Sequence, residues 1–400
     1  MTQAPTPLLE PRDGLPPVVV DAPRLAATVK AFASGTGPVA IDAERASGYR
    51  YGQRAYLIQL RRSGAGTSLI DPIACGDLSA LGTAIGDAEW VLHAANQDLP
   101  CLAEIGLRPT RIFDTELAAR LLDYPRVGLG PLIEEVLGYS LEKGHSAVDW
   151  STRPLPTDWL RYAALDVELL VELRAILADQ LDHAGKREWA DEEFAAIVAA
   201  TPSEPRSDPW RRTSGLHRVR DRRQLAAVRE MWLERDKLAQ ARDISPKRLL
   251  PDTAIIEAAL AGPTSVRELA GLPVFRGRAQ RREAKRWFAA VSSARQIPEG
   301  DLPDLTNRYD GPPPARAWTA RDPAAADRLA AARAAVAEIA EQHSLPVENL
   351  LAPETLRRVA WEPPAPLTDE GVAAALTERG ARSWQVRLTA AEITAAFTQE

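Results

Sequence analysis

Apolar and polar residues alternate in short runs through the first part of the chain and then change to a helical period. Four runs are apolar enough for buried strands, at 39–44, 55–60, 67–70 and 90–93. After Asp114, leucines and valines recur every three or four residues, and over 157–177 this spacing predicts one long helix. The pattern predicts an α/β domain whose sheet comes early in the chain.

Two proline-rich stretches divide the second half of the chain, and the blocks after each have helical periodicity throughout. These blocks share a weak internal similarity, in which a helical run is followed by DISPKRLLP at 243–251 or by SLPVENLLAP at 344–353. The expected organisation is a flexible segment (1–20), an α/β domain (21–200), a linker (201–209), a helical domain (210–296), a second linker (297–317) and a diverged copy of the helical domain (318–400).

Net charge changes the picture when it is divided along the chain. The whole chain carries −6, with a pI near 5.6, which alone argues against a nucleic-acid partner. Residues 1–205 hold 18 basic and 29 acidic residues, residues 206–296 hold 21 and 10, and residues 297–400 hold 10 and 16. A block of +11 thus lies between blocks of −11 and −6, an asymmetry typical of nucleic-acid contact.

Composition also excludes several classes of protein. No run of about 18 apolar residues is present, so a spanning helix is not expected, and the first residues do not read as a signal peptide. Only Cys75 and Cys101 are available, too few for a disulfide framework. We therefore expect a cytoplasmic protein with no membrane partner.

Asp42 and Glu44 lie two residues apart within an apolar strand. Strand alternation places both carboxylates on one face of the sheet. For an isolated pair, the solvated face of an edge strand is the better explanation, since like charges side by side otherwise require a compensating cation.

Three further residues favour a cation site. Asp98 follows a buried strand, and Tyr162 and Asp166 are four apart and share a helix face. Each alone has an ordinary explanation: a helix cap for Asp98, a solvated face for the other two. Four carboxylates converging with a phenol form a cage suited to hard divalent cations, which prefer oxygen ligands.

The order of these motifs resembles a known superfamily. Ile41-Asp-Ala-Glu44, His93-Ala-Ala-Asn-Gln-Asp98 and Tyr162-Ala-Ala-Leu-Asp166 are similar to the three motifs of the DEDD 3′–5′ exonucleases, tyrosine subclass. Intervening segments, such as Phe113-Asp-Thr115 and the stretch 143–150, resemble the ribonuclease D family. Residues 225–250 resemble its HRDC nucleic-acid-binding domain.

The resemblance implies a ribonuclease-H-like exonuclease domain, with a mixed central sheet flanked by helices, followed by two HRDC-like helical bundles. It implies hydrolysis of RNA from the 3′ end to 5′-mononucleotides with two divalent cations, Mg²⁺ or Mn²⁺. Asp42 would bridge both ions, Glu44 and Asp166 would complete one site, and Asp98 would hold the other ion. Tyr162 would orient the attacking water. The five catalytic residues are therefore Asp42, Glu44, Asp98, Tyr162 and Asp166.

Other residues are weaker candidates. His93 is expected to be a buried packing residue, and Asp114 a helix cap. Trp287 is a candidate for stacking on a base. Candidate nucleic-acid contacts are Gln59, Lys143, Ser146, Arg211, Arg212, Arg222, Arg223, Arg281, Arg282, Lys285 and Arg286.

Three functions are compatible with these residues. The first is a monomeric exoribonuclease acting on transfer-RNA precursors or other structured RNA with a free 3′ end, without a nucleotide cofactor. The second is a 3′–5′ DNA exonuclease, since no residue can be assigned to reading a 2′-hydroxyl. The third is a catalytically silent RNA-binding protein, disfavoured because all five expected side chains are present.

Overall fold

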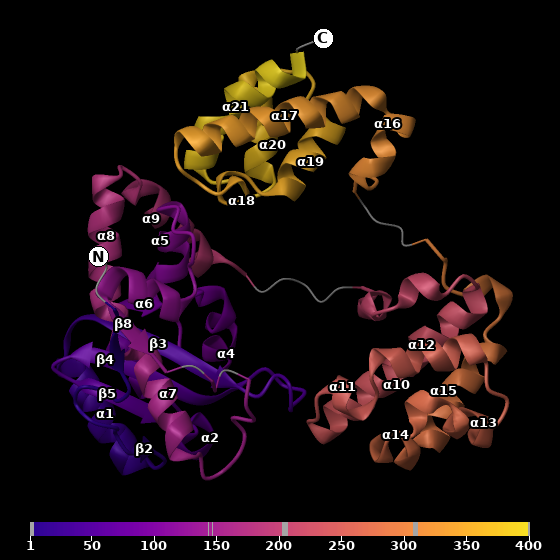
Figure 1. The fold of residues 1–400 in the computed structure, drawn as a ribbon, viewed down its shortest axis with the longest axis horizontal. Helices are drawn as coiled ribbons and strands as arrows, with labels where there is room; N and C mark the ends of the chain where they lie inside the picture. The colour runs from indigo at the N-terminus through magenta and orange to yellow at the C-terminus, as the bar shows by residue number, and fades with distance from the viewer. Residues whose placement is uncertain (1–3, 143, 146, 202–206, 307–310, 399–400) are drawn as a thin grey trace.

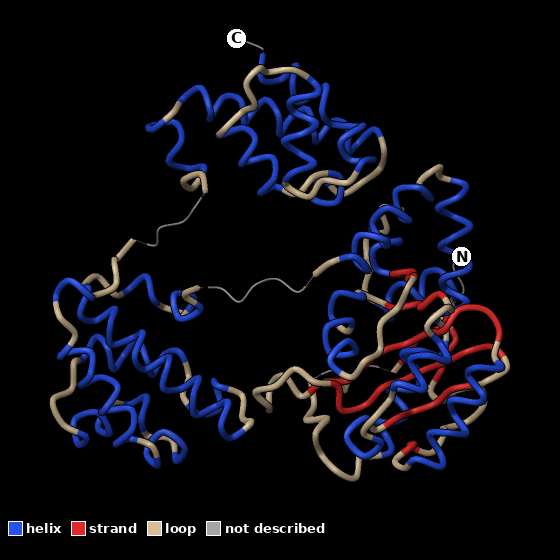
Figure 2. Tube along the Cα trace, turned by 180° about the vertical axis from the view of Figure 1, so that it is seen from behind, coloured by secondary structure: helices blue, strands red, loops and turns tan. Residues whose placement is uncertain are grey.

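The computed structural model describes residues 4–142, 144–145, 147–201, 207–306 and 311–398. Figure 1 shows three lobes, one built on a sheet and two built of helices alone. Figure 2 shows that every strand lies in the first lobe, which holds the amino terminus. This arrangement agrees with the α/β domain and the two helical domains expected from the sequence pattern.

A six-stranded mixed sheet forms the centre of the first lobe, in the order β2-β5-β4-β3-β6-β7. β4 is antiparallel to both β3 and β5, whereas β6 is parallel to β3 and to β7. The strands are β2 (Val18–Val19), β3 (Thr36–Arg45), β4 (Ala55–Ser63), β5 (Gly66–Ile70), β6 (Glu89–Leu92) and β7 (Arg111–Asp114). The predicted mixed sheet is confirmed, and β7 is a strand that the sequence pattern did not reveal.

The strand of Asp42 and Glu44 lies inside this sheet and not at its edge. β3 pairs with β4 on one side and with β6 on the other, and Asp42 is opposite Gln59 of β4. The edge-strand explanation for the two carboxylates is therefore excluded. Their charges lie on a central strand, where solvent does not compensate for them.

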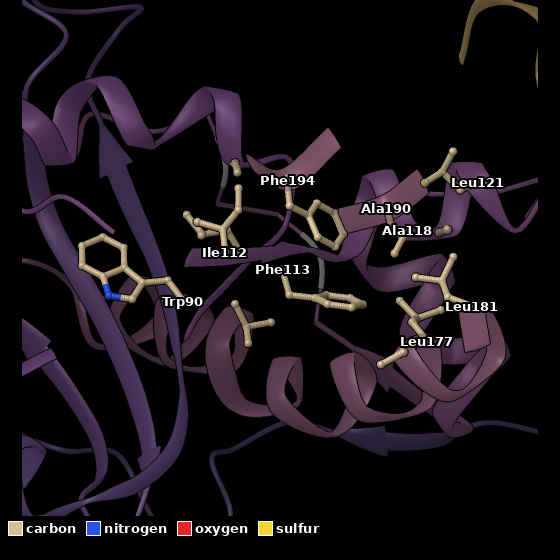
Figure 3. Close-up of a cluster of buried hydrophobic side chains, with 14 of the residues drawn as sticks. Trp90, Ile112, Phe113, Ala118, Leu121, Leu177, Leu181, Ala190 and Phe194 are labelled. Atoms are coloured by element: carbon tan, nitrogen blue, oxygen red, sulfur yellow. The ribbon is translucent and has the colours of Figure 1, made fainter. Parts of the chain in front are cut away.

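Helices bury both faces of the sheet, which explains why β4 is a nearly unbroken apolar run. Ile58 and Leu60 belong to one core, whereas Leu57 belongs to another core that includes Trp150. Figure 3 shows part of the first core, which includes Phe113 and Phe194. The centroids of these two rings are 5.0 Å apart. The flanking helices are α1 (Ala22–Ser34), α2 (Pro72–Cys75), α3 (Ser79–Ile85), α4 (Leu99–Glu104), α5 (Thr115–Leu121), α6 (Leu129–Leu137), α7 (Thr157–Glu168), α8 (Leu170–His183) and α9 (Arg187–Ala199).

The prediction of one long helix over 157–177 is wrong. The helix is interrupted at Leu169, whose ψ is 4°, so that α7 and α8 are separate. α7 packs on β3, β4 and β5, whereas α8 packs on α5, β3 and β6. The break lets each helix bury a different face, a tertiary preference that a continuous apolar period does not reveal.

The expected flexible segment at 1–20 also differs from the structure. β1 (Thr6–Leu8) pairs in parallel with β8 (Tyr139–Leu141), and β2 extends the main sheet beside β5. Between them, the backbone N–H of Arg12 donates to the buried Glu168, 3.2 Å away. Strand pairing and this contact order residues 4–20, a stretch whose five prolines favour extended backbone.

The second lobe has its own hydrophobic core around the long helix α10. Asp221 caps that helix by accepting from the N–H groups of Arg223 and Gln224. Its α-helices are α10 (Arg222–Arg242), α11 (Pro246–Leu249), α12 (Asp252–Ala261), α13 (Val266–Gly271), α14 (Arg278–Arg282) and α15 (Ala284–Gln296).

The third lobe docks on the first through α9. The indole rings of Trp189 and Trp384 stack with centroids 4.9 Å apart, and Lys186 Nζ donates to the carbonyl oxygen of Ser344, 3.0 Å away. Buried residues of both lobes belong to one continuous core. The α-helices of this lobe are α16 (Trp318–Arg321), α17 (Pro323–Gln342), α18 (Val347–Leu350), α19 (Pro353–Trp361), α20 (Asp369–Glu378) and α21 (Ser383–Thr398).

Within the described residues, no helix is both long and apolar enough to cross a membrane. Cys75 and Cys101 are free thiols.

Candidate active site

The five catalytic candidates converge on one cavity of about 450 Å³. β3 carries Asp42 and Glu44, the segment before α4 carries Asp98, and α7 carries Tyr162 and Asp166. Three distant parts of the chain thus meet as the motif order implied. The cavity is also lined by the short stretch Ser47 to Tyr49 and by His93.

The carboxylates are close enough to share a cation. Oxygen atoms of Asp42, Glu44 and Asp166 all lie within 4.8 Å of one another. Asp98 lies outside this group of three, but its carboxyl group shares a hydrogen bond with that of Asp42. Gln59 is fully buried, and its Nε2 donates to Asp42 Oδ2, 3.3 Å away. Gln59 therefore orients Asp42, and the prediction that it contacts substrate is wrong.

The electrostatics of the cluster disfavour four negative charges. Burial, followed by the Asp42 charge, raises the pKa of Glu44 well above its ordinary value, and the same two causes raise that of Asp166. Burial and Asp42 raise the pKa of Asp98 to about 9. Without a cation, burial and crowding therefore favour the protonated over the ionised form of these carboxyl groups, and Asp98 keeps its proton at neutral pH. Hard divalent cations fit this donor set, because each would replace protons with positive charge.

Asp98 and Asp114 both precede helices but have different roles. Asp114 accepts from the N–H groups of Glu116 and Leu117, and it also accepts from those of Ala94 and Ala95. It is the predicted helix cap, and in addition it holds the segment that leads to Asp98. Asp98 occupies the N-cap position immediately before α4, yet its side chain makes no capping hydrogen bond. Its carboxyl group faces the cluster instead, so the cap explanation fails for it.

The hydroxyl group of Tyr162 contacts the carboxylate cluster. That hydroxyl donates to Asp166, and burial, followed by the Asp166 charge, raises the pKa of Tyr162. The phenol therefore stays protonated at neutral pH and acts as a hydrogen-bonding group. His93 is half-buried and lines the cavity, so it is not the fully buried packing residue predicted. Its Nδ1 lies 2.9 Å from Thr115 Oγ1, and burial lowers its pKa to about 4.

The second lobe contacts the rim of this cavity, which the sequence did not predict. Asp243 Oδ1 accepts from the N–H groups of Tyr51 and Gly52, each 3.2 Å away. Ser245 N–H donates to the Tyr49 carbonyl, 2.9 Å away, and the Arg248 guanidinium lies 4.3 Å from the centroid of the Tyr49 ring. Asp243 thus ties the helical lobe to a loop that begins inside the cavity.

Replacing Asp243 with Ala is expected to loosen this loop. The change removes the acceptor of two backbone N–H groups, whereas Asp243→Asn keeps an oxygen there and tolerates the left-handed backbone, φ 48°. We expect amide hydrogen exchange at Tyr51 and Gly52 to accelerate about tenfold in the Ala variant alone. Glu257→Gln, which removes an exposed ion pair with Arg218 in the same lobe, is the control. Unchanged exchange would contradict the tether.

Several of the arginines predicted to contact nucleic acid instead bind carbonyl and carboxylate groups of the protein itself. Arg222 and Arg223 donate to backbone carbonyls of residues 294–303 and pair with Glu299. Arg211 pairs with Asp208 and donates to the carbonyl of Asp304. These arginines hold the segment that follows α15 against the start of the lobe, and nothing places them at a nucleic-acid surface.

Other basic candidates lie at the surface. Arg212, Arg281, Arg282 and Lys285 are exposed, and Arg286 pairs with Glu234 and Glu283. Trp287 is fully buried, so the prediction that it stacks on a base is wrong. Lys143 and Ser146 lie outside the described residues. Sequence reasoning also missed Arg45, which lines the cavity beside the carboxylates.

Comparison with known proteins agrees with this geometry. Residues 17–182 match the family model described as 3′-5′ exonuclease, residues 224–291 match the HRDC domain, and residues 311–397 match the 3′ to 5′ exonuclease C-terminal domain. The last match is to a model other than HRDC, so the idea that the third lobe is a diverged HRDC copy stays a prediction.

Relatives with similar sequences are named ribonuclease D. One from Gluconacetobacter diazotrophicus is 31% identical over 81% of both chains, and one from Granulibacter bethesdensis is 32% identical over the same shares. A crystal structure of a protein from Bifidobacterium adolescentis is 40% identical, with a TM-score of 0.91 over 99% of this chain and 100% of that one. The structure of Escherichia coli RNase D is 26% identical, with a TM-score of 0.66 over 90% and 97%. This chain therefore belongs to the ribonuclease D family and is a 3′–5′ exoribonuclease.

Proposed function

We propose that this exoribonuclease removes nucleotides from the 3′ ends of structured RNA, transfer-RNA precursors included, and releases nucleoside 5′-monophosphates. The observation that carries the proposal is the convergence of Asp42, Glu44 and Asp166 in one cavity, within 4.8 Å of one another. The Escherichia coli relative is described as an exoribonuclease involved in structured RNA processing, which supports the choice of substrate.

The carboxylate cage would hold two divalent cations, Mg²⁺ or Mn²⁺. Asp42 is central, because it neighbours both the Glu44–Asp166 pair and the Asp98 carboxyl group. It would contact both ions, with Glu44 and Asp166 at one and Asp98 at the other. Cations in such a site lower the pKa of bound water and neutralise charge that develops on the phosphate. The protein contributes fixed carboxylates, with Gln59 holding Asp42 in place.

Tyr162 would orient the attacking water from beside Asp166. A phenol is mostly protonated at neutral pH and is a poor base there, so its contribution would be a hydrogen bond to the water.

Replacing Tyr162 with Phe is expected to lower kcat roughly 10- to 100-fold, with little change in Mn²⁺ affinity, because the carboxylates stay intact. Single-turnover hydrolysis and calorimetric Mn²⁺ titration would measure the two quantities. Trp159→Phe, on the same helix, serves as the aromatic control. A kcat of the Phe variant within threefold of the unsubstituted enzyme would refute the role.

The substrate class is tested by matched RNA and DNA oligonucleotides of one sequence. Each is offered with a free or a blocked 3′ end, with Mg²⁺, with Mn²⁺ and with neither. We expect mononucleotide release from free-ended RNA only when a cation is present. A preference for DNA would favour the alternative of a DNA exonuclease, and cation-independent hydrolysis would refute the metal site.

The exposed cations of the second lobe are the proposed RNA surface. Among the residues that the structure describes, Arg212, Arg281 and Lys285 have no internal partner of the kind that occupies Arg222 and Arg223, and Arg282 has only a contact with Glu283 at 4.0 Å. Lys/Arg contacts with phosphates weaken steeply with salt, so RNA affinity should fall as salt rises. We propose a monomer acting in the cytoplasm, a compartment consistent with the free thiols.

A further inference from the structure

Arg45 is the basic side chain that lines the carboxylate cavity. Among the described residues lining it, which include all five catalytic candidates, no other Lys or Arg occurs. Arg45 is half-buried at the end of β3, directly after Glu44. Arg45 therefore lines the same cavity as the converging carboxylates.

This guanidinium makes no hydrogen bond or ion pair with any described residue. Its neighbours differ: Arg50 Nε donates to Ser151 Oγ at 2.8 Å, and Arg54 reaches both the Tyr56 hydroxyl and Asp243. The positive charge of Arg45 is near enough to lower the pKa values of Asp42, Glu44 and Asp98, yet none of these carboxyls pairs with it. A half-buried arginine keeps all its donors unused within an acidic cavity.

A β-bulge lies at the step that leads to Arg45. Glu44 is opposite Leu57 and Arg45 is opposite Ala55, so Tyr56 is an extra residue in β4. Arg45 is the last residue of β3, where the strand ends beside this bulge, and it lines the same cavity as Glu44. Bulges are common beside active sites.

We propose that Arg45 contacts the non-bridging oxygens of the scissile phosphate during RNA hydrolysis. The guanidinium fork matches two phosphate oxygens and keeps its charge at every working pH. A phosphate that approaches carboxylates is repelled, and a fixed positive charge in the same cavity opposes that repulsion and stabilises charge developing in the transition state. This inference rests on the proposed function, since it takes the cavity as the site of hydrolysis.

The test compares Arg45→Gln, Arg45→Lys and Arg24→Gln. The last removes one positive charge from α1, where Arg24 is exposed and pairs with Asp21. Substrates are a single-stranded RNA and the small diester thymidine 5′-(p-nitrophenyl phosphate), which contains the reacting phosphate alone. Binding of adenosine 5′-monophosphate is measured by calorimetry with Ca²⁺, and Mn²⁺ affinity and thermal unfolding are measured for each variant.

We expect Arg45→Gln to lower kcat/KM roughly 10- to 100-fold on both substrates and to weaken adenosine 5′-monophosphate binding about tenfold, the range for hydrogen bonds to charged groups. Arg45→Lys should recover part of the loss, and Arg24→Gln should match the unsubstituted enzyme. Values within threefold on both substrates, or a loss on RNA alone, would overturn the proposal. So would tighter Mn²⁺ binding with unchanged nucleotide binding, the behaviour of a mere counter-charge. Full activity of Asp166→Asn would instead refute the proposed function itself.

Discussion

Replacing Asp166 with Asn is expected to lower hydrolysis of RNA 3′ ends by roughly 10³-fold or more. The change removes one of the three carboxylates that lie within 4.8 Å of one another, while the size of the side chain stays the same. Charge stabilisation by metal ions at phosphoryl centres amounts to several kcal/mol, and each 1.4 kcal/mol is a factor of ten in rate. Mononucleotide release in Mg²⁺ and in Mn²⁺ measures the loss.

The same substitution should stabilise the protein when metal is absent. Burial and the Asp42 charge raise the pKa of Asp166, so its ionised form is disfavoured in the fold. Asn carries no charge, and we therefore expect a higher Tm than that of the unsubstituted enzyme in EDTA above pH 7, but not in excess Mn²⁺. Asp158→Asn is the matched control, because Asp158 lies on the same helix with an exposed side chain. Equal activity losses for the two variants would contradict a specific role for Asp166.

Much of the carboxylate cage could be predicted because its paired residues are spaced by the repeat of the strand or helix that carries them. Residues two apart on a strand lie on the same face, so the spacing predicts that Asp42 and Glu44 are neighbours. Residues four apart on a helix also share a face, which predicts the same for Tyr162 and Asp166. The mixed sheet and the helical lobes follow from the change of apolar period. Local spacing does not predict that the three motifs meet in one site. That prediction comes from their order along the chain, which resembles the motif order of a known superfamily.

Features that depend on distant contacts were not predictable. The β-bulge beside Arg45 arises from an extra residue in the partner strand, and the local pattern of β3 does not predict it. Arg222 and Arg223 are basic residues in a basic block, yet the chain returns about 75 residues later and its carbonyls accept from both of them. Net charge located the basic lobe, but only tertiary structure separates arginines that hold the fold from those left exposed.

The apparent affinity for Mn²⁺ is expected to rise at least about 100-fold between pH 6 and pH 8. Burial and Asp42 raise the pKa of Asp98 to about 9, and burial and Asp42 raise that of Glu44 well above its ordinary value. Asp98 therefore holds a proton in the metal-free fold at neutral pH, whereas a cation requires its carboxylate, so binding releases at least this proton. Each proton released makes the affinity rise about tenfold per pH unit. Calorimetry in two buffers of different ionisation enthalpy counts the protons directly.

The sign of the stability change follows from the same groups. Because their folded-state pKa values are raised, their contribution to stability is fully present below the unfolded values near 4 and is lost as pH rises through the folded values. Metal-free protein should therefore lose stability between pH 5 and pH 9, and excess Mn²⁺ should restore it most at the alkaline end. In Asp98→Asn, the affinity slope should fall by about one proton. A flat Mn²⁺ affinity from pH 6 to pH 8 would mean that the cage is already ionised without metal, contrary to its burial and crowding.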